Sequence, residues 1–189
     1  MQNRRSFIAM VMGLAAAPLI PSLAFAQSAM PSTDQIERQL RAAPRSRVRP
    51  EQRTTVRELK RRPELRRMAP SIDIQSINFA TGSAEIPRSQ YQKVEAIARA
   101  MERILRRNRR EVFLIEGHTD AVGSFASNQR LSEERADSLR SVLIREFGIP
   151  RGALETVGYG EEFLLVPTQN EEWRNRRVTL RRVTEVLRQ

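Results

Sequence analysis

The chain has 189 residues, a formal net charge of +11 and no cysteine. This length allows one ordinary domain with a buried core. The lack of cysteine excludes a disulfide framework, thiolate metal sites, cysteine nucleophiles and a lipid anchor on an N-terminal cysteine. A single histidine leaves little room for a histidine-based metal site or a Ser-His-Asp triad. We therefore expect no metal and no cofactor.

Residues 1–26 have the features of an export signal. Arg4 and Arg5 precede an apolar run, and Ala24-Phe25-Ala26 provides a cleavage site. Two adjacent arginines are also typical of twin-arginine signals, so the general and the twin-arginine export routes both stay open. A retained membrane helix is the alternative, because residues 7–26 are uncharged and about long enough to span a bilayer. We expect cleavage and a periplasmic protein.

The next segment, residues 27–70, is basic and interrupted by prolines. Between Pro31 and Pro70 it has twelve lysines and arginines, five acidic residues and no aromatic residue. A segment of this composition cannot bury a core of its own. We predict a mostly disordered spacer with one short helix near residues 51–62. It is either a solvated linker or a segment attracted to anionic envelope polymers or lipids; nucleic acid is not expected as a partner of an exported chain.

Residues 71–189 are predicted to form the folded domain, in which strands alternate with helices. Apolar residues recur at helical spacing in the first predicted helix, as at Val94, Ile97 and Met101. This order predicts an α/β two-layer sandwich, with a mixed sheet of about four strands and two main helices packed on one face. The predicted strands are residues 72–79, 111–117, 154–158 and 176–183, and the predicted helices are residues 87–107 and 132–147.

Polar residues connect the second predicted strand to the second predicted helix. The strand ends at Gly117, a loop presents Asp120, and Ser132 is a suitable N-cap with Arg135 in the first helical turn. A cation there costs about 0.3–1 kcal/mol against the helix dipole, so we expect Asp120 to offset it. Either the two charges form a salt bridge that holds the loop, or they bracket a ligand with an ammonium and a carboxylate, which an arginine fork binds well.

A family resemblance rests on the same residues. The pattern GHTDxxGxxxxNxxLSxxRA, residues 117–136, resembles the signature of OmpA-like peptidoglycan-binding domains. Motifs at residues 77–83, 158–161 and 175–178 match in the expected order, so that the resemblance spans about residues 72–183. It implies an OmpA-like fold and non-catalytic binding of peptidoglycan, through the diaminopimelate side chain of the stem peptide, in the Gram-negative envelope.

The resemblance also implies which residues bind the ligand. In the family, the aspartate of HTD takes the ammonium of diaminopimelate and the arginine of LSxxRA takes its carboxylate. These residues are Asp120 and Arg135 here. Whether the domain forms a homodimer stays open. The expected ligand-binding set is Thr119, Asp120, Asn128, Leu131, Arg135 and Arg176.

Two other functions are considered. If residues 7–26 are retained, the protein is a membrane-tethered envelope anchor; a proton-driven stator is disfavoured, because these residues include no acid. A peptidoglycan hydrolase is the enzyme alternative. Glu116 and Asp120 are its candidate carboxylates, but nothing in the sequence favours an acid role for either. His118 is not expected to be catalytic, and Tyr159 and Trp173 are expected to pack or to line the rim.

Overall fold

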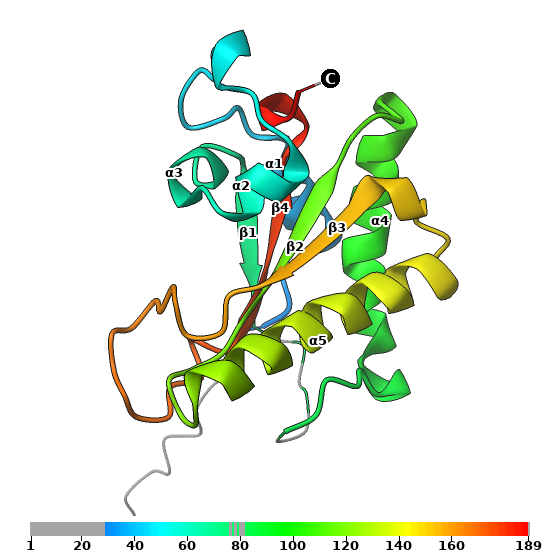
Figure 1. Cartoon of the computed structure of the whole chain (residues 1–189). Coiled ribbons are helices and arrows are strands. Elements are labelled where there is room, and N and C mark those ends of the chain that lie inside the picture. Colours follow the sequence, from blue (N-terminus) through cyan, green and yellow to red (C-terminus); the bar gives the residue numbers. More distant parts are fainter. Residues whose placement is uncertain (1–28, 76, 78, 80–81, 189) are drawn as a thin grey trace, which may run out of the picture.

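The computed structural model describes residues 29–75, 77, 79 and 82–188 (Figure 1). The predicted export signal lies outside the described residues, so its cleavage and its route remain predictions. Among the residues that are described, no helix has the length and the apolar character needed to cross a membrane.

Four strands form one mixed sheet in the order β1-β4-β2-β3. Strand β4 lies antiparallel to both of its neighbours, whereas β2 and β3 are parallel. The predicted fold class and the four predicted strands are confirmed, although the first strand ends at Ile74 and not at residue 79. The strands are β1 (Ser71–Ile74), β2 (Phe113–His118), β3 (Leu154–Gly158) and β4 (Arg177–Arg182).

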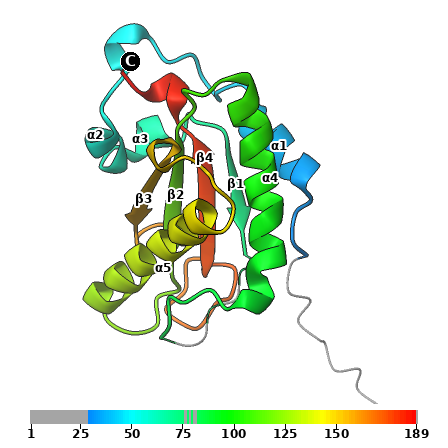
Figure 2. The ribbon, with the colours of Figure 1, turned by 90° about the vertical axis from the view of Figure 1, so that its right-hand side faces the viewer.

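Two long helices cover one face of this sheet, as predicted (Figures 1 and 2). They are α4 (Tyr91–Arg107) and α5 (Phe125–Arg145), and a short 3-10 turn, Arg88–Gln90, precedes α4. The main core lies between them and the sheet, where Ile97 and Met101 of α4 and Leu139 of α5 are fully buried. The helical spacing of these apolar residues therefore determines which side of each helix faces the sheet.

The prediction that the second helix begins at Ser132 is wrong. Helix α5 begins at Phe125 and is capped by Ser124, whose hydroxyl accepts a hydrogen bond from Ser127 N. Ser132 is fully buried within the helix, and its hydroxyl donates to Gln129 O and accepts from Gly160 N, both at 2.8 Å. Arg135 thus lies in the middle of α5, where the helix dipole does not act on it.

The prediction of a disordered spacer is also wrong for its described part, residues 29–70. This arm forms three helices, and a 3-10 turn, Pro50–Gln52, lies between the first two. The short helix predicted near residues 51–62 corresponds to α2. Ser32 begins the first helix with a capping box to Gln35. The three helices are α1 (Thr33–Arg41), α2 (Val56–Lys60) and α3 (Pro63–Arg66).

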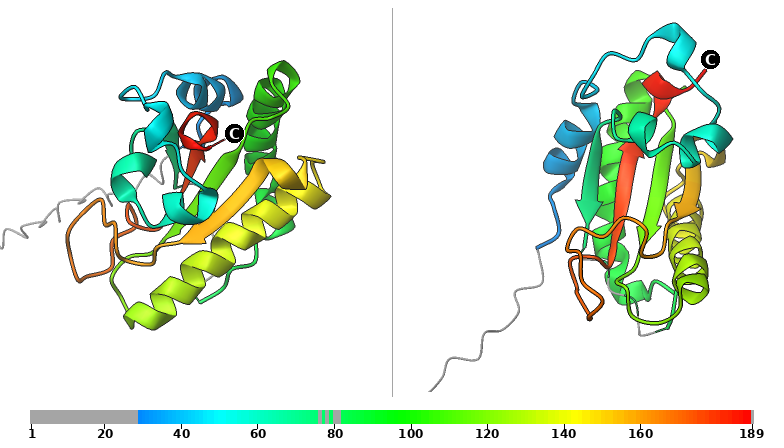
Figure 3. Two further views of the ribbon diagram at one scale, coloured as in Figure 1. Left: turned by 45° about the horizontal axis from the view of Figure 1, so that its top comes forward. Right: turned by 60° about the vertical axis from the view of Figure 1, so that its left-hand side comes forward.

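The arm is ordered because its few apolar side chains are buried by the domain. Ile36 and Leu40 of α1 are fully buried in the main core beside α4, while Leu59 and Leu65 join a second cluster under the opposite face of the sheet. Figure 3 shows α2 and α3 on the side of the sheet away from α5. Composition predicts correctly that the arm cannot form its own core. It does not reveal that the folded domain, which lies later in the sequence, buries the apolar side chains of the arm.

A buried arginine fixes α3 to the sheet. Arg66 Nε lies 3.0 Å from Glu116 Oε1, and the two side chains are 3% and 1% exposed. The Arg66 guanidinium also lies over the rings of Tyr159 and Phe163, 3.9 Å and 4.5 Å from their centroids. Arg181 Nε donates to the same Glu116 oxygen at 2.7 Å. One carboxylate of β2 therefore joins the arm to β4.

Two glycines let the backbone of α5 lie directly on the strand ends. A Cβ at Gly117 would come within 2.0 Å of Ser132 O, and one at Gly158 would come within 2.4 Å of Glu133 N. A larger residue at either position would push the helix off the sheet, since backbone atoms cannot yield as a side chain does. The contact determines where the loop after Gly117 runs.

We predict that Gly117→Ala lowers the free energy of unfolding by about 3 kcal/mol or more, the upper range for overpacking. The measurement is urea denaturation followed by circular dichroism. Gly152→Ala is the matched control, because a Cβ there has no neighbour within 4 Å. Equal stability of the two variants would contradict the close contact.

Candidate functional site

The predicted site residues come together at one edge of the sheet. Asp120 follows the end of β2, and Arg176 directly precedes β4. The antiparallel register pairs His118 with Arg177, so these two segments leave the sheet side by side. Helix α5 crosses the same edge and supplies Asn128, Leu131 and Arg135. The sequence motif thus predicts correctly which segments meet.

The carboxylate of Asp120 holds a cation from the same chain. Arg176 Nη1 donates to Asp120 Oδ2 at 2.7 Å and to Glu171 Oε1 at 2.8 Å. The Asp120 side chain is 10% exposed and the Arg176 side chain is 38% exposed. Burial by itself would lower the pKa of Arg176, but Asp120 and Glu171 raise it above its ordinary value. The pair is therefore charged and open to solvent on the Arg176 side.

Arg135 does not form the salt bridge with Asp120 that was one of the two predicted arrangements. Its Nε donates to Ser83 O at 3.2 Å, and its guanidinium lies over the Phe79 ring, 4.8 Å from the centroid. Among the described residues, no carboxylate lies within ion-pair distance of it. Burial, and then the charge of Arg176, lower the pKa of Arg135, while Asp120 opposes this shift. Arg135 is a largely buried cation that faces a second cation.

The other predicted residues hold the loops of the site. Asn128 Nδ2 donates to Glu161 Oε2 at 2.6 Å and to Val122 O at 3.2 Å, and thus ties α5 to the loops on either side. Thr119 N donates to Gly160 O at 2.9 Å, and the Thr119 hydroxyl is buried without a hydrogen-bond partner among the described residues. Leu131 is half-buried on α5.

Glu171 and Ser83 also belong to the site, although neither is among the six predicted residues. Glu171 bonds Arg176 and Ser83 bonds Arg135, the latter through a backbone oxygen. A backbone contact leaves no signal in residue types, and Glu171 lies in a loop without a periodic pattern. Phe79 was part of a matched motif, but its position under Arg135 follows only from the fold.

Glu116 and Asp120 do not form a hydrolase pair. Glu116 points into the layer between the sheet and α3, where it contacts Arg66 and Arg181. Burial would raise the pKa of Glu116, but His118, Arg181 and Arg66 together hold it below its ordinary range. A carboxyl group that stays ionised cannot protonate a leaving group. Tyr159 is buried and donates its hydroxyl to Lys60 O at 2.8 Å, so it is a packing residue.

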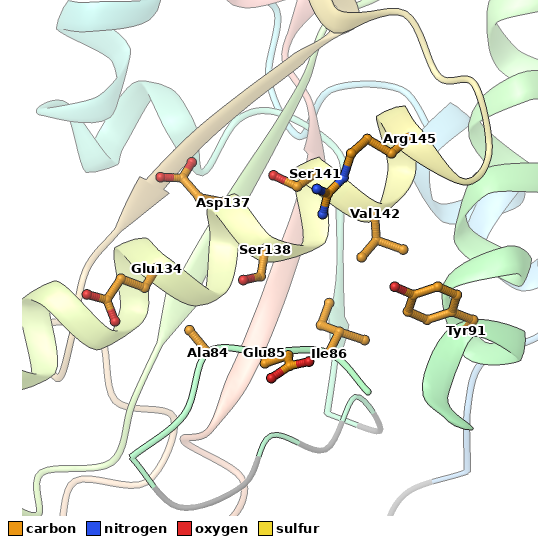
Figure 4. A pocket seen from close by; sticks show the side chains of 10 residues that line it. All are labelled: Ala84, Glu85, Ile86, Tyr91, Glu134, Asp137, Ser138, Ser141, Val142 and Arg145. Atoms are coloured by element: carbon orange, nitrogen blue, oxygen red, sulfur yellow. The ribbon is translucent and has the colours of Figure 1, made fainter. Parts of the chain in front are cut away.

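A separate groove of about 490 Å³ lies between α5 and the segment before α4 (Figure 4). It starts next to Ser83, the residue that Arg135 bonds, but none of the six predicted residues lines it. No group of acidic and histidine side chains suited to a metal ion occurs among the described residues. The groove is lined by Ala84, Glu85, Ile86, Tyr91, Glu134, Asp137, Ser138, Ser141, Val142 and Arg145.

Comparison with known proteins identifies the family of the chain. Residues 78–178 match the OmpA family. Outer membrane porin F of Pseudomonas aeruginosa is 48% identical over 66 residues, which are 34% of this chain and 19% of that protein. An outer membrane protein of Gluconacetobacter diazotrophicus is 47% identical over 74 residues, 35% of this chain and 19% of that protein. The matched part therefore spans about a fifth of these relatives.

A solved structure has the same fold. The periplasmic domain of Helicobacter pylori MotB superimposes with a TM-score of 0.50 at 23% identity, covering 58% of this chain and 70% of that chain. The predicted resemblance to OmpA-like domains is thus confirmed in sequence and in fold.

We predict that stability falls, by up to about 1 kcal/mol, between pH 7.0 and pH 5.5 because of His118. Burial lowers the pKa of His118 below its ordinary value of 6.5, although Glu116 opposes the shift. The unfolded chain takes up a proton near pH 6.5 while the folded chain does not, so acid favours unfolding. Urea denaturation at several pH values measures this, with His118→Gln as control. His118 is the single histidine; a variant with an unchanged slope would contradict the assignment.

Proposed function

Because the chain belongs to the OmpA family, we propose that it binds peptidoglycan without cleaving it, through the diaminopimelate side chain of the stem peptide. The protein would act in the periplasm of a Gram-negative cell, associated with the cell wall or the outer membrane. The outer membrane names of its relatives support this location. The ordered motifs of residues 117–136 support the ligand.

The observation that carries the proposal is the cation on Asp120. Arg176 Nη1 occupies the Asp120 carboxylate at 2.7 Å, so this loop binds and partly desolvates a positive charge. An alkylammonium has the same charge and also donates N–H hydrogen bonds to a carboxylate. In the proposed complex the ligand ammonium takes the place of the Arg176 guanidinium. Arg176 keeps its second partner, Glu171, which already lies 2.8 Å from it.

The carboxylate end of the ligand has a matching receptor. Arg135 has no carboxylate partner among the described residues, its Nε is fixed by Ser83 O, and its ring contact with Phe79 orients the guanidinium plane. A fixed guanidinium binds a carboxylate through two parallel hydrogen bonds. Release of Arg176 from Asp120 places a second guanidinium near the same carboxylate. The site then binds both charged groups of an amino-acid headgroup.

The two alternative functions have separate tests. A hydrolase would release soluble muropeptides from purified sacculi, and we expect no release. The tethered anchor requires residues 7–26 to be retained, which the intact mass of the exported protein decides. A mass equal to that of a chain beginning at Gln27 supports a free periplasmic protein.

We predict that Asp120→Asn and Arg135→Gln each weaken binding to purified sacculi by at least about 30-fold, since losing one partner of a buried charge pair costs about 2–5 kcal/mol. Sedimentation of the protein with sacculi measures the bound fraction. Both variants should unfold at the wild-type urea concentration within about 1 M, which separates lost binding from lost folding.

Matched controls come from the same helix. Arg130→Gln and Asp137→Asn each remove one exposed charge from α5, just as the two test variants each remove one charge from the site. Both controls should bind sacculi like the wild type. If all four variants bind equally, the pocket assignment is wrong even though the fold is correct.

We also predict that free diaminopimelate releases the protein from sacculi, whereas cadaverine, which is diaminopimelate without its two carboxylates, does so at least about tenfold less well at the same concentration. Cadaverine presents an ammonium at each end but no carboxylate, so it cannot bond the Arg135 guanidinium. Release is measured as protein in the supernatant over a range of competitor concentrations. Equal release by both compounds would mean that Arg135 does not read the carboxylate.

A further inference from the structure

Eight exposed arginines gather at the end of the sheet opposite Asp120. They lie on three segments: the loop after α1, the last turn of α4 with the turn that follows it, and the C-terminal turn after β4. None of the eight has a carboxylate within 4.0 Å among the described residues, as the ion pairs of the structure involve other arginines. We call this set the basic end; it consists of Arg45, Arg47, Arg49, Arg106, Arg107, Arg109, Arg110 and Arg188.

One paired arginine holds these three segments together. Arg182, at the end of β4, donates to Leu40 O at 2.8 Å and to Ala42 O at 3.4 Å. It also bonds Glu111 at 3.2 Å and Glu185 at 2.9 Å. The start of the arm loop, the turn before β2 and the C-terminal turn therefore meet at a single guanidinium. The arginines around it belong to one surface, although they are far apart in the sequence.

The basic end is short of neutralising acids. Glu111 and Glu185 are already bonded to Arg182. Glu58 accepts hydrogen bonds from the side chains of Thr54 and Thr55, and its pKa is lowered by them and also by the charge of Arg188, so it offsets part of one arginine; Glu51 is exposed. Arginines of the neighbouring helices do have partners, such as Arg103 with Asp34 at 2.6 Å. This end thus has eight exposed arginines and few acids that are free to pair with them.

The basic end and the proposed wall site lie at opposite ends of the sheet (Figures 1 and 3). Strand β2 runs from the turn at residues 108–112 to the loop of Asp120. Its six residues separate the two ends by about 20 Å at ~3.3 Å per residue. A flat object bound at the basic end leaves Asp120 and Arg176 accessible on the other side.

We propose that the basic end binds the surface of a bilayer that contains anionic phospholipids. Each arginine close to such a surface adds favourable attraction to the lipid phosphates, and a broad array of arginines suits a broad layer of charge. The three segments have no aromatic side chain between residues 42 and 49, 106 and 110, or 184 and 188. Single-stranded nucleic acid is bound with stacking aromatic side chains, so its chemistry fits this end less well.

This inference stands without the wall-binding proposal, but the two together have a consequence that rests on both. One molecule would hold a membrane surface at one end and the stem peptide at the other. The distance between the two would then be set by a rigid sheet and not by a flexible spacer.

The test is co-sedimentation of residues 27–189, the chain without the predicted export signal, with vesicles of phosphatidylcholine alone or with 30% phosphatidylglycerol. Arg106→Gln/Arg109→Gln/Arg110→Gln removes three charges from the basic end. We expect about a hundredfold weaker binding to the anionic vesicles, from ~1 kcal/mol for each arginine. The matched control removes three exposed charges elsewhere: Arg88→Gln/Arg130→Gln/Arg145→Gln.

The control should bind anionic vesicles within about threefold of the wild type, and 0.5 M NaCl should release the wild type, since salt screens exposed charges. Equal weakening in both triple variants would overturn the proposal, because net charge alone would then explain binding. Equal binding of the wild type to neutral and anionic vesicles would also overturn it. Tight, salt-sensitive binding to DNA without binding to anionic vesicles would identify a different partner and reject this one.

The two proposals fail separately. The Arg106/Arg109/Arg110 variant should still bind sacculi, and Asp120→Asn should still bind anionic vesicles. Loss of sacculus binding in the first variant would show that the two ends are not independent.

Discussion

The direct contact between the backbone of α5 and the ends of β2 and β3 determines where every group of the site lies. Gly117 and Gly158 leave no side chain between helix and sheet, and the Ser132 hydroxyl accepts a hydrogen bond from Gly160 N across the contact. The loop that leaves β2 must therefore run along the first turns of α5, and Asn128 ties it there through Val122 O. Asp120 lies on that loop. Its position therefore depends on the close helix–sheet contact that Gly117 and Gly158 allow.

The same sheet has a different kind of contact on its other face. Glu116 is buried between Arg66 and Arg181, and replacing such a network by apolar residues is often neutral for stability. Here the network determines which arginine of the arm packs against the sheet. The arm has many arginines, but Arg66 is the one that fits over Tyr159 and reaches Glu116. This explains why sequence composition misleads. Twelve basic residues in forty suggest a solvated chain, while Arg66 and buried apolar residues such as Ile36 and Leu59 fix the arm.

The sequence allowed the fold class, the strand order along the chain and the meeting of residues 120, 135 and 176 to be predicted, because periodicity and a long motif report on them. It did not reveal the true start of α5. Ser124 and Ser132 are both acceptable caps, and residues 125–131 have no apolar stripe, since Phe125 is exposed and the helix contacts the strands through its backbone. The pairing of Asp120 with Arg176 could not be predicted either, because two arginines compete for one acid and only the register of β2 with β4 decides between them.

The outcome of that competition explains why Arg135 is kept unpaired. A cation that is largely buried without a carboxylate loses solvation, and burial accordingly lowers the pKa of Arg135, with Arg176 acting in the same direction. A structural arginine at this position would gain stability from a nearby acid, yet Asp120 is taken by Arg176 and the partner of Arg135 is a backbone oxygen of Ser83. The site thus stores an unfavourable charge in the free protein. In the proposed complex a carboxylate between the two arginines would relieve it, so that part of its binding free energy would come from the fold itself.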